Sequence, residues 1–203
     1  MKNIKTVALL IIGNILFACD VVTLEHPIGV PIVEDLGGKL DGVWYGGEDI
    51  SVLYVKYKSN GILQIAGVEW NEGKFALRDT MCLLTVLDGV SYINLPINFP
   101  ATDSTDQTTG YVFARYTLTE QWFQDYHYLV LYYPKTEFFK EAVKNGNLKG
   151  KIISNYGDWI DIEDVKENVD EFIENHAAQE MFDFSKITVL KRISSEIPDK
   201  VFE

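Results

Sequence analysis

The pattern of apolar and polar residues beyond position 40 is typical of a β protein. Short runs rich in Val, Ile, Leu, Tyr, Phe and Thr follow one another as far as residue 133, and turn residues separate them. A further run of this kind stands near the end of the chain. The expected strands are residues 42–46, 50–58, 62–70, 75–87, 91–95, 111–118, 128–133 and 187–193.

Short turns between these runs favour antiparallel neighbours. Asn60 with Gly61, and Asp88 with Gly89, readily take the positive φ angles that a two-residue hairpin turn requires. Strands joined in this way form a meander, because a parallel sheet would need long crossover connections. The sequence therefore predicts an antiparallel meander, either open or closed into a barrel.

Alternation along residues 111–118 indicates one buried face and one wetter face. The apolar face carries Val112, Ala114, Tyr116 and Leu118, and the other face carries Arg115 and Thr117.

Beyond residue 133 the apolar period changes to that of helices. Thr136 opens one short amphipathic helix, which ends at Asn145 and Gly146. A second helix is expected to begin near Asp161, with acidic residues opposite an apolar stripe. The fold class is therefore mainly β, with two short packing helices in the C-terminal third.

The first residues have the pattern of an export signal. Lys2 and Lys5 precede an apolar run, Val7 to Ala18, which is too short for a bilayer that needs roughly 20 apolar residues. Prolines and a glycine pair then make residues 19–38 a predicted tether. The expected organisation is a signal peptide over 1–18, the tether over 19–38 and one β-rich domain over 39–203.

Charge restricts the partners. The net charge of −12 becomes −14 once Lys2 and Lys5 are removed with the signal. Such a surface repels nucleic acid and anionic headgroups, so we expect no nucleic-acid partner. Cys82 is expected to be a buried small hydrophobic residue.

The end of the apolar run resembles the lipobox of bacterial lipoproteins. Leu16 stands three residues before Cys19 and the small Ala18 directly before it, although Phe17 departs from the usual small residue. The resemblance implies lipidation of Cys19, membrane attachment through acyl chains and a cell-envelope location. With Asp20 next, that location would be the periplasmic side of the inner membrane in a Gram-negative host, or otherwise the outer face of the plasma membrane. A non-lipidated export signal and a buried apolar N-terminal helix remain open.

Gly42, Val43 and Trp44, together with the distant Arg192, resemble the lipocalin or calycin class of barrels. In that class a Gly-x-Trp opens the first strand, and its Trp packs across the barrel base on an Arg from the end of the chain. The resemblance implies structural roles for Gly42, Trp44 and Arg192. The body of the chain also resembles bacterial lipoproteins of unknown function, which brings no activity with it.

Aromatic residues are abundant in the expected strands, and some of them must point inward. In a hollow barrel they would line a pocket for a small lipophilic ligand; in a filled one they would form a solid core. The candidate ligand-binding residues are Tyr54, Tyr111, Phe113, Tyr116, Tyr128 and Tyr132.

Catalytic and metal-binding patterns are weak. The histidines lack the partner spacing of a zinc site, and the acidic run from Asp158 to Asp164 fits the start of a helix better than calcium. We expect no catalytic residue, metal or cofactor. The function predicted is a non-enzymatic binding or scaffold module that meets a lipophilic ligand or an envelope protein. The alternatives are an envelope hydrolase using carboxylates or Asp125 with His127, and a purely structural or inhibitory protein.

Overall fold

The structure is a computed structural model that describes residues 21–46, 52–71, 74–100, 107–121, 126–153, 159–198 and 200–202. The predicted signal peptide, Cys19, Asp125 and Asp158 lie outside these residues.

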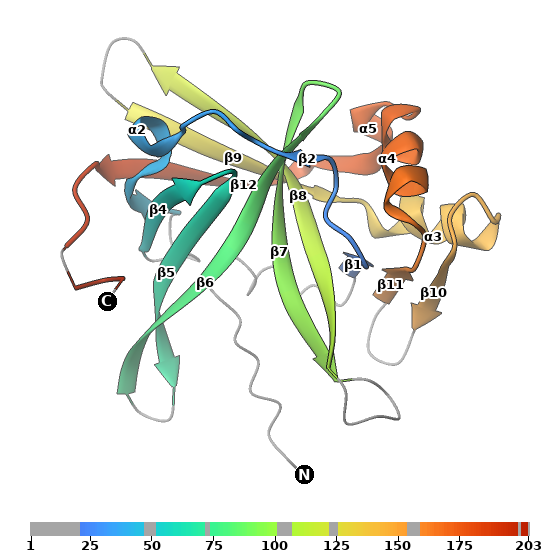
Figure 1. Ribbon diagram of the computed structural model, residues 1–203, viewed down its shortest axis with the longest axis horizontal. Helices are drawn as coiled ribbons and strands as arrows, with labels where there is room; N and C mark the ends of the chain where they lie inside the picture. The colour runs from blue at the N-terminus through green and yellow to red at the C-terminus, as the bar shows by residue number, and fades with distance from the viewer. Residues whose placement is uncertain are drawn as a thin grey trace.

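Eight antiparallel strands close into a barrel (Figure 1). They are β3 (Gly42–Tyr45), β4 (Leu53–Ser59), β5 (Ile62–Asn71), β6 (Lys74–Leu87), β7 (Val90–Pro100), β8 (Gln107–Gln121), β9 (Tyr126–Pro134) and β12 (Phe182–Ser194). Consecutive strands from β3 to β9 pair with each other, and β12 closes the ring by pairing with both β9 and β3. This confirms the predicted fold class, and such a barrel is compatible with the lipocalin-like class.

Two predicted hairpin turns are confirmed. Asn60 and Gly61 have φ angles of 50° and 77°, and Asp88 and Gly89 have 46° and 71°. Gly61 also lies against the neighbouring strand, since a Cβ there would stand 2.3 Å from the carbonyl oxygen of Leu84. The first turn therefore requires glycine for both its conformation and its close approach.

Apolar side chains from all eight strands pack inside the barrel. Trp44 and Leu53 are fully buried there, at 0% exposure. Val112, Ala114 and Tyr116 belong to the same cluster and Leu118 packs against it, which confirms the face predicted for this strand.

A small side sheet extends from the edge of β8. It consists of β1 (Val21–Leu24), β11 (Trp159–Ile162) and β10 (Gly150–Ile153); β1 is parallel to β11 and antiparallel to β8. All four residues of β1 are buried.

The prediction of a tether over residues 19–38 is therefore wrong for the residues described. Beyond β1, the strand β2 (Val30–Pro31) pairs with β6, and the short helix α2 (Gly37–Leu40) follows. Local sequence misled the prediction, because the proline and glycine positions in this segment mark bends between elements whose partners are distant.

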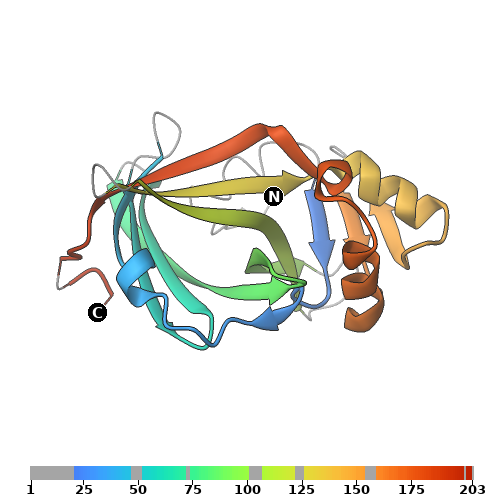
Figure 2. The same ribbon diagram turned by 90° about the horizontal axis from the view of Figure 1, so that it is seen from above.

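Three helices cover the outer face of the side sheet (Figure 2). They are α3 (Thr136–Lys144), α4 (Lys166–Glu174) and α5 (Ala178–Met181). Their apolar sides form a second core with β1, β11 and the outer face of β8. The prediction of a helix start near Asp161 is wrong, because that residue lies in β11 and α4 begins at Lys166.

Within the described parts of the chain, we find no helix whose length and apolar character would let it cross a membrane.

Candidate functional site

A cavity of about 690 Å³ opens at the end of the barrel where α2 and the β6–β7 turn lie. Figure 1 shows α2, this turn and the end of β8 at the upper end of the barrel. The described pairing between β7 and β8 ends at Tyr92 and Arg115. Beyond that pair β8 continues past the β6–β7 turn, and its residues 116–119 line the cavity. Leu36 and Lys39 lie across from it and supply an apolar contact and a cation.

We call this cavity, at the end of the barrel, the mouth cavity. Tyr116 provides its aromatic surface. Its ring is largely buried in the barrel core, and burial raises the pKa of its hydroxyl to about 12, opposed by a hydrogen bond with Ser91. The hydroxyl therefore stays protonated at neutral pH, able to donate a hydrogen bond from the end of an apolar ring. The mouth cavity thus suits a small molecule that is mostly apolar and carries one polar end.

The six aromatic candidates do not gather in one pocket. Tyr116 points into the barrel, whereas Phe113 lies one residue out of phase and packs in the second core, outside the barrel wall. The others occupy the same outward phase of their strands, as the ladder positions show: Tyr54, Tyr111, Tyr128 and Tyr132. Alternation fixes which residues share a face, but the closure of the barrel decides which face is inside.

Gly42, Trp44 and Arg192 meet at the base of α2. Trp44 pairs with Arg192 across the β3–β12 ladder, and its indole Nε1 donates a hydrogen bond of 2.8 Å to the carbonyl oxygen of Leu40. Arg192 Nη1 donates to the carbonyl oxygens of Gly38 and Lys39 at 3.1 and 3.2 Å. These bonds satisfy carbonyls that a helix leaves unpaired at its C-terminal end.

Gly42 permits the close approach of β3 to the end of β12. Its φ angle is +142°, and a Cβ at this position would stand 2.1 Å from the carbonyl oxygen of Ser194. The start of β3 therefore lies too close to the end of β12 for any larger residue.

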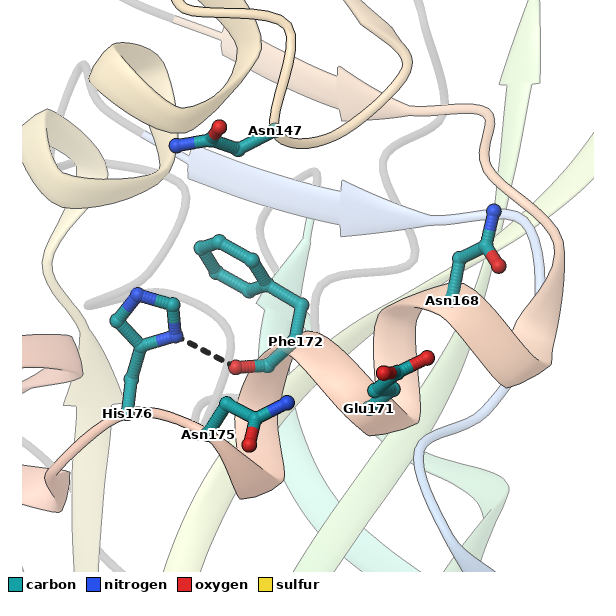
Figure 3. Close-up of a pocket in the computed structure, with 6 residues that line it drawn as sticks. All are labelled: Asn147, Asn168, Glu171, Phe172, Asn175 and His176. Atoms are coloured by element: carbon teal, nitrogen blue, oxygen red, sulfur yellow. Dashed lines mark hydrogen bonds between the residues drawn. The ribbon is translucent and has the colours of Figure 1, made fainter.

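A second recess lies between α3 and α4 (Figure 3). Two adjoining cavities of about 420 and 350 Å³ share Asn147, Phe172 and His176 in their linings. His176 Nδ1 lies 2.6 Å from the carbonyl oxygen of Phe172, and the two rings contact each other at a tilt of 37° with centroids 4.3 Å apart. If Nδ1 carries the proton, Nε2 is the hydrogen-bond acceptor. Three asparagines and Glu171 surround an aromatic floor, an arrangement suited to a small polar molecule.

The catalytic and calcium candidates are not brought together in the described residues. His127 faces Glu120 in the β8–β9 ladder, while its proposed partner Asp125 lies outside the described residues. Asp161 accepts a hydrogen bond of 3.0 Å from the Thr23 hydroxyl, and burial raises its pKa. The part of the chain that the structure describes contains no cluster of three or more His, Cys, Asp or Glu side chains placed to hold a metal.

Asp164 has the opposite environment. It accepts hydrogen bonds from the backbone N–H groups of Lys149 and Val165, at 2.9 and 3.0 Å, and from Asn168 Nδ2. These donors, that of Lys149 above all, lower the pKa of its carboxyl group. Asp164 therefore stabilises the turn into α4, which accounts for a carboxylate at this position without a metal ion.

Comparison with known proteins shows no matching protein family, no similar curated protein and no similar solved structure.

Proposed function

We propose that this protein is a lipid-anchored binding module of the cell envelope, attached to the membrane through acyl chains on Cys19. The observation that carries the proposal is the apolar run that ends in Leu16, Phe17, Ala18 and Cys19 and resembles a lipobox. β1 begins at Val21, two residues after the cysteine, so cleavage before Cys19 would remove none of the described elements. A signal peptidase could therefore release residues 1–18 and leave the whole described domain on the lipid.

The anchor would need no other membrane-binding segment. Two or more acyl chains on one residue suffice for stable attachment, since a single chain gives only marginal binding. The acidic body contributes nothing to general attraction, because a net charge of −12 in the full chain opposes anionic headgroups.

The binding role rests on the mouth cavity. Tyr116 and Leu36 offer apolar area there, and Lys39 and Glu34, which form an ion pair of 3.6 Å, add polar groups. The ligand class that fits is a small lipophilic molecule with a hydrogen-bonding end.

Lipidation is tested by expressing the full chain in a bacterial host and analysing the membrane fraction by mass spectrometry. We expect a mature chain that starts at a triacylated or diacylated Cys19. The Cys19→Ser variant should lose the lipid mass and leave the membrane fraction. A full-length soluble chain that keeps residues 1–18 would overturn the anchor.

Binding is tested separately by native mass spectrometry of protein purified from its host. We expect a lipophilic molecule to accompany the protein, and Leu118→Trp, which places a larger ring in the cavity, to reduce the bound fraction. Ser185→Trp, on β12 and outside the cavity, is the matched control and should leave the bound fraction unchanged. Equal occupancy in both variants would contradict the assignment of the ligand to the mouth cavity.

A further inference from the structure

Exposed apolar side chains form a stripe along the outer face of β12. They are Phe184, Ile187, Val189 and Ile193, and Tyr45 of the adjacent β3 continues the same face. Their exposed fractions are 42%, 45%, 42%, 54% and 43% in that order. We call this set the β12 stripe. Large apolar side chains that lie side by side in water are unfavourable unless something covers them.

The charges along the stripe are opposite to those of the chain as a whole. From Phe184 to Ile193 there is no acidic residue, and the basic side chains on the outer face are Lys186 and Lys191; Asp183, directly before this segment, interacts with Lys186. In the whole chain, acidic residues outnumber basic ones 30 to 18. The neighbouring strand β9 contains no acidic residue either.

A further cation lies at the start of the stripe. The guanidinium carbon of Arg115 stands 5.8 Å from the ring centres of Tyr132 and of Phe184. The stripe therefore combines apolar surface with positive charge in an acidic protein, as surfaces at a membrane interface do.

The stripe begins close to the point where Cys19 would hold the domain. β9 and β1 follow each other along one edge of β8, β9 pairing as far as Arg115 and β1 pairing at Val112 with Thr23. Those two β8 residues are roughly 10 Å apart along the strand. Cys19 precedes Thr23 by four residues, which places it within roughly 14 Å of Thr23. An anchor on Cys19 therefore leaves β12 within reach of the bilayer.

We propose that the β12 stripe is a membrane-facing surface that lies in the headgroup region of an anionic bilayer. The inference rests on the lipid anchor of the proposed function and adds the orientation of the domain on it. Apolar side chains of the stripe enter the interface, and Lys186 and Lys191 lie next to lipid phosphates. The acidic remainder of the surface then points away from the anionic headgroups, which lowers the repulsion that any other orientation would bring.

A second copy of the chain fits this surface less well. Two stripes brought face to face would oppose lysine to lysine. Strand addition is limited because β9 pairs with one edge of β12, and β3 pairs with the Lys191–Ser194 part of the other edge.

The orientation can be measured with single labels on the mature, lipidated protein in vesicles of phosphatidylcholine and phosphatidylglycerol. Val189→Cys places a label in the stripe, and Met81→Cys is the matched control. These positions are 42% and 44% exposed, and β6 lies four strands from β12 around the eight-stranded barrel. Figure 2 shows the two strands along opposite sides. The native Cys82 is buried, and burial raises the pKa of its thiol, so it resists labelling.

We expect lipids that carry a quencher to quench a fluorophore at position 189 strongly and one at position 81 weakly. Adding Lys186→Glu and Lys191→Glu should remove most of this difference, whereas Lys144→Glu on α3 should not. Equal quenching at 81 and 189 on vesicle-bound protein overturns the orientation and leaves the anchor intact. Protein that does not remain with the vesicles instead overturns the anchor.

Two other occupants of the stripe would show different results. Self-quenching between labels at position 189, with no quenching by lipid, assigns the stripe to a second copy and contradicts the proposal. A label at position 189 that is shielded from both lipid and aqueous quenchers assigns the stripe to another protein or to a segment of the chain, and contradicts it as well.

Discussion

Trp44 lies directly opposite Arg192 in the β3–β12 ladder, and both side chains donate hydrogen bonds to backbone carbonyls of α2. Residues far apart in the sequence thus hold one short helix over the end of the barrel. Leu40, the last residue of that helix, is buried in the barrel core. Trp44 and Arg192 therefore fix the position of α2 beside the mouth cavity.

Replacing Trp44 by Ala should lower the free energy of unfolding by about 3 to 5 kcal/mol. The change removes a fully buried ring and leaves the Leu40 carbonyl without its indole donor. Urea denaturation of the variant gives the value. Tyr45→Ala, next in the strand and 43% exposed, is the control and should cost much less. Equal losses would contradict the core role of Trp44.

Gly42→Ala should lower the free energy of unfolding by about 1 to 3 kcal/mol, because it combines an unfavourable φ angle with a clash against the carbonyl oxygen of Ser194. Gly38→Ala, in α2, tests whether the loss of any glycine matters. A Cβ at Gly38 has no neighbour within 4 Å, and Ala favours helix, so this variant should be neutral or slightly stabilised. Thermal melts of both variants distinguish the cases.

Asn94→Ala should cost about 1 to 3 kcal/mol through an unsatisfied buried donor. Asn94 is fully buried, and its Oδ1 accepts a hydrogen bond of 2.9 Å from the backbone N–H of Ile28. This bond ties the N-terminal segment to β7. Hydrogen exchange of the Ile28 amide should be faster in Asn94→Ala than in the wild type, and unchanged in the exposed control Asn175→Ala. Unchanged exchange at Ile28 in Asn94→Ala would contradict the role of this bond.

Asp161→Asn and Asp164→Asn should show opposite dependences on pH. The folded-state pKa of Asp161 is raised from 3.8, so the stability associated with its neutral form is lost as the pH rises through that pKa. An amide cannot ionise, so Asp161→Asn should gain stability relative to the wild type between pH 3 and pH 7. The pKa of Asp164 is lowered, so its contribution is present above 3.8 and is lost as the pH falls through the folded pKa. Asp164→Asn should therefore lose relative stability at pH 7. Urea denaturation across this pH range would contradict the assignment if both variants shifted in the same direction.

Much of the barrel is predictable because its information is local. Alternation and hairpin turns specify antiparallel neighbours, so Asn60 with Gly61 and Asp88 with Gly89 mark turns that the structure confirms. The apolar period likewise indicates α3 and α4, although α4 begins later than predicted and the short α5 was not predicted. Which face of a strand enters the barrel depends on closure, and this is why Tyr132 lies outside while Tyr116 lies inside.

The side sheet and the recess between α3 and α4 could not be predicted, because the segments that form them are distant in the sequence. β1 is four residues long and pairs in parallel with β11, more than a hundred residues away. Nothing near Val21 indicates that pairing, and proline residues nearby favoured a linker. The cleft of Figure 3 likewise depends on how α4 packs beside α3. The one local signal was His176, four residues after Phe172 and just beyond the end of α4, where the ring can return to that backbone carbonyl.

The pairing of β1 with β11 also bears on the order in which the chain can fold. A polypeptide made from its N-terminus has to reach Ile162 before β1 can complete its contacts. Until then the residues beside Cys19 have no finished docking partner, and closing so long a loop is slow. An exported chain would thereby keep its leading end unfolded and open to processing enzymes during most of its synthesis.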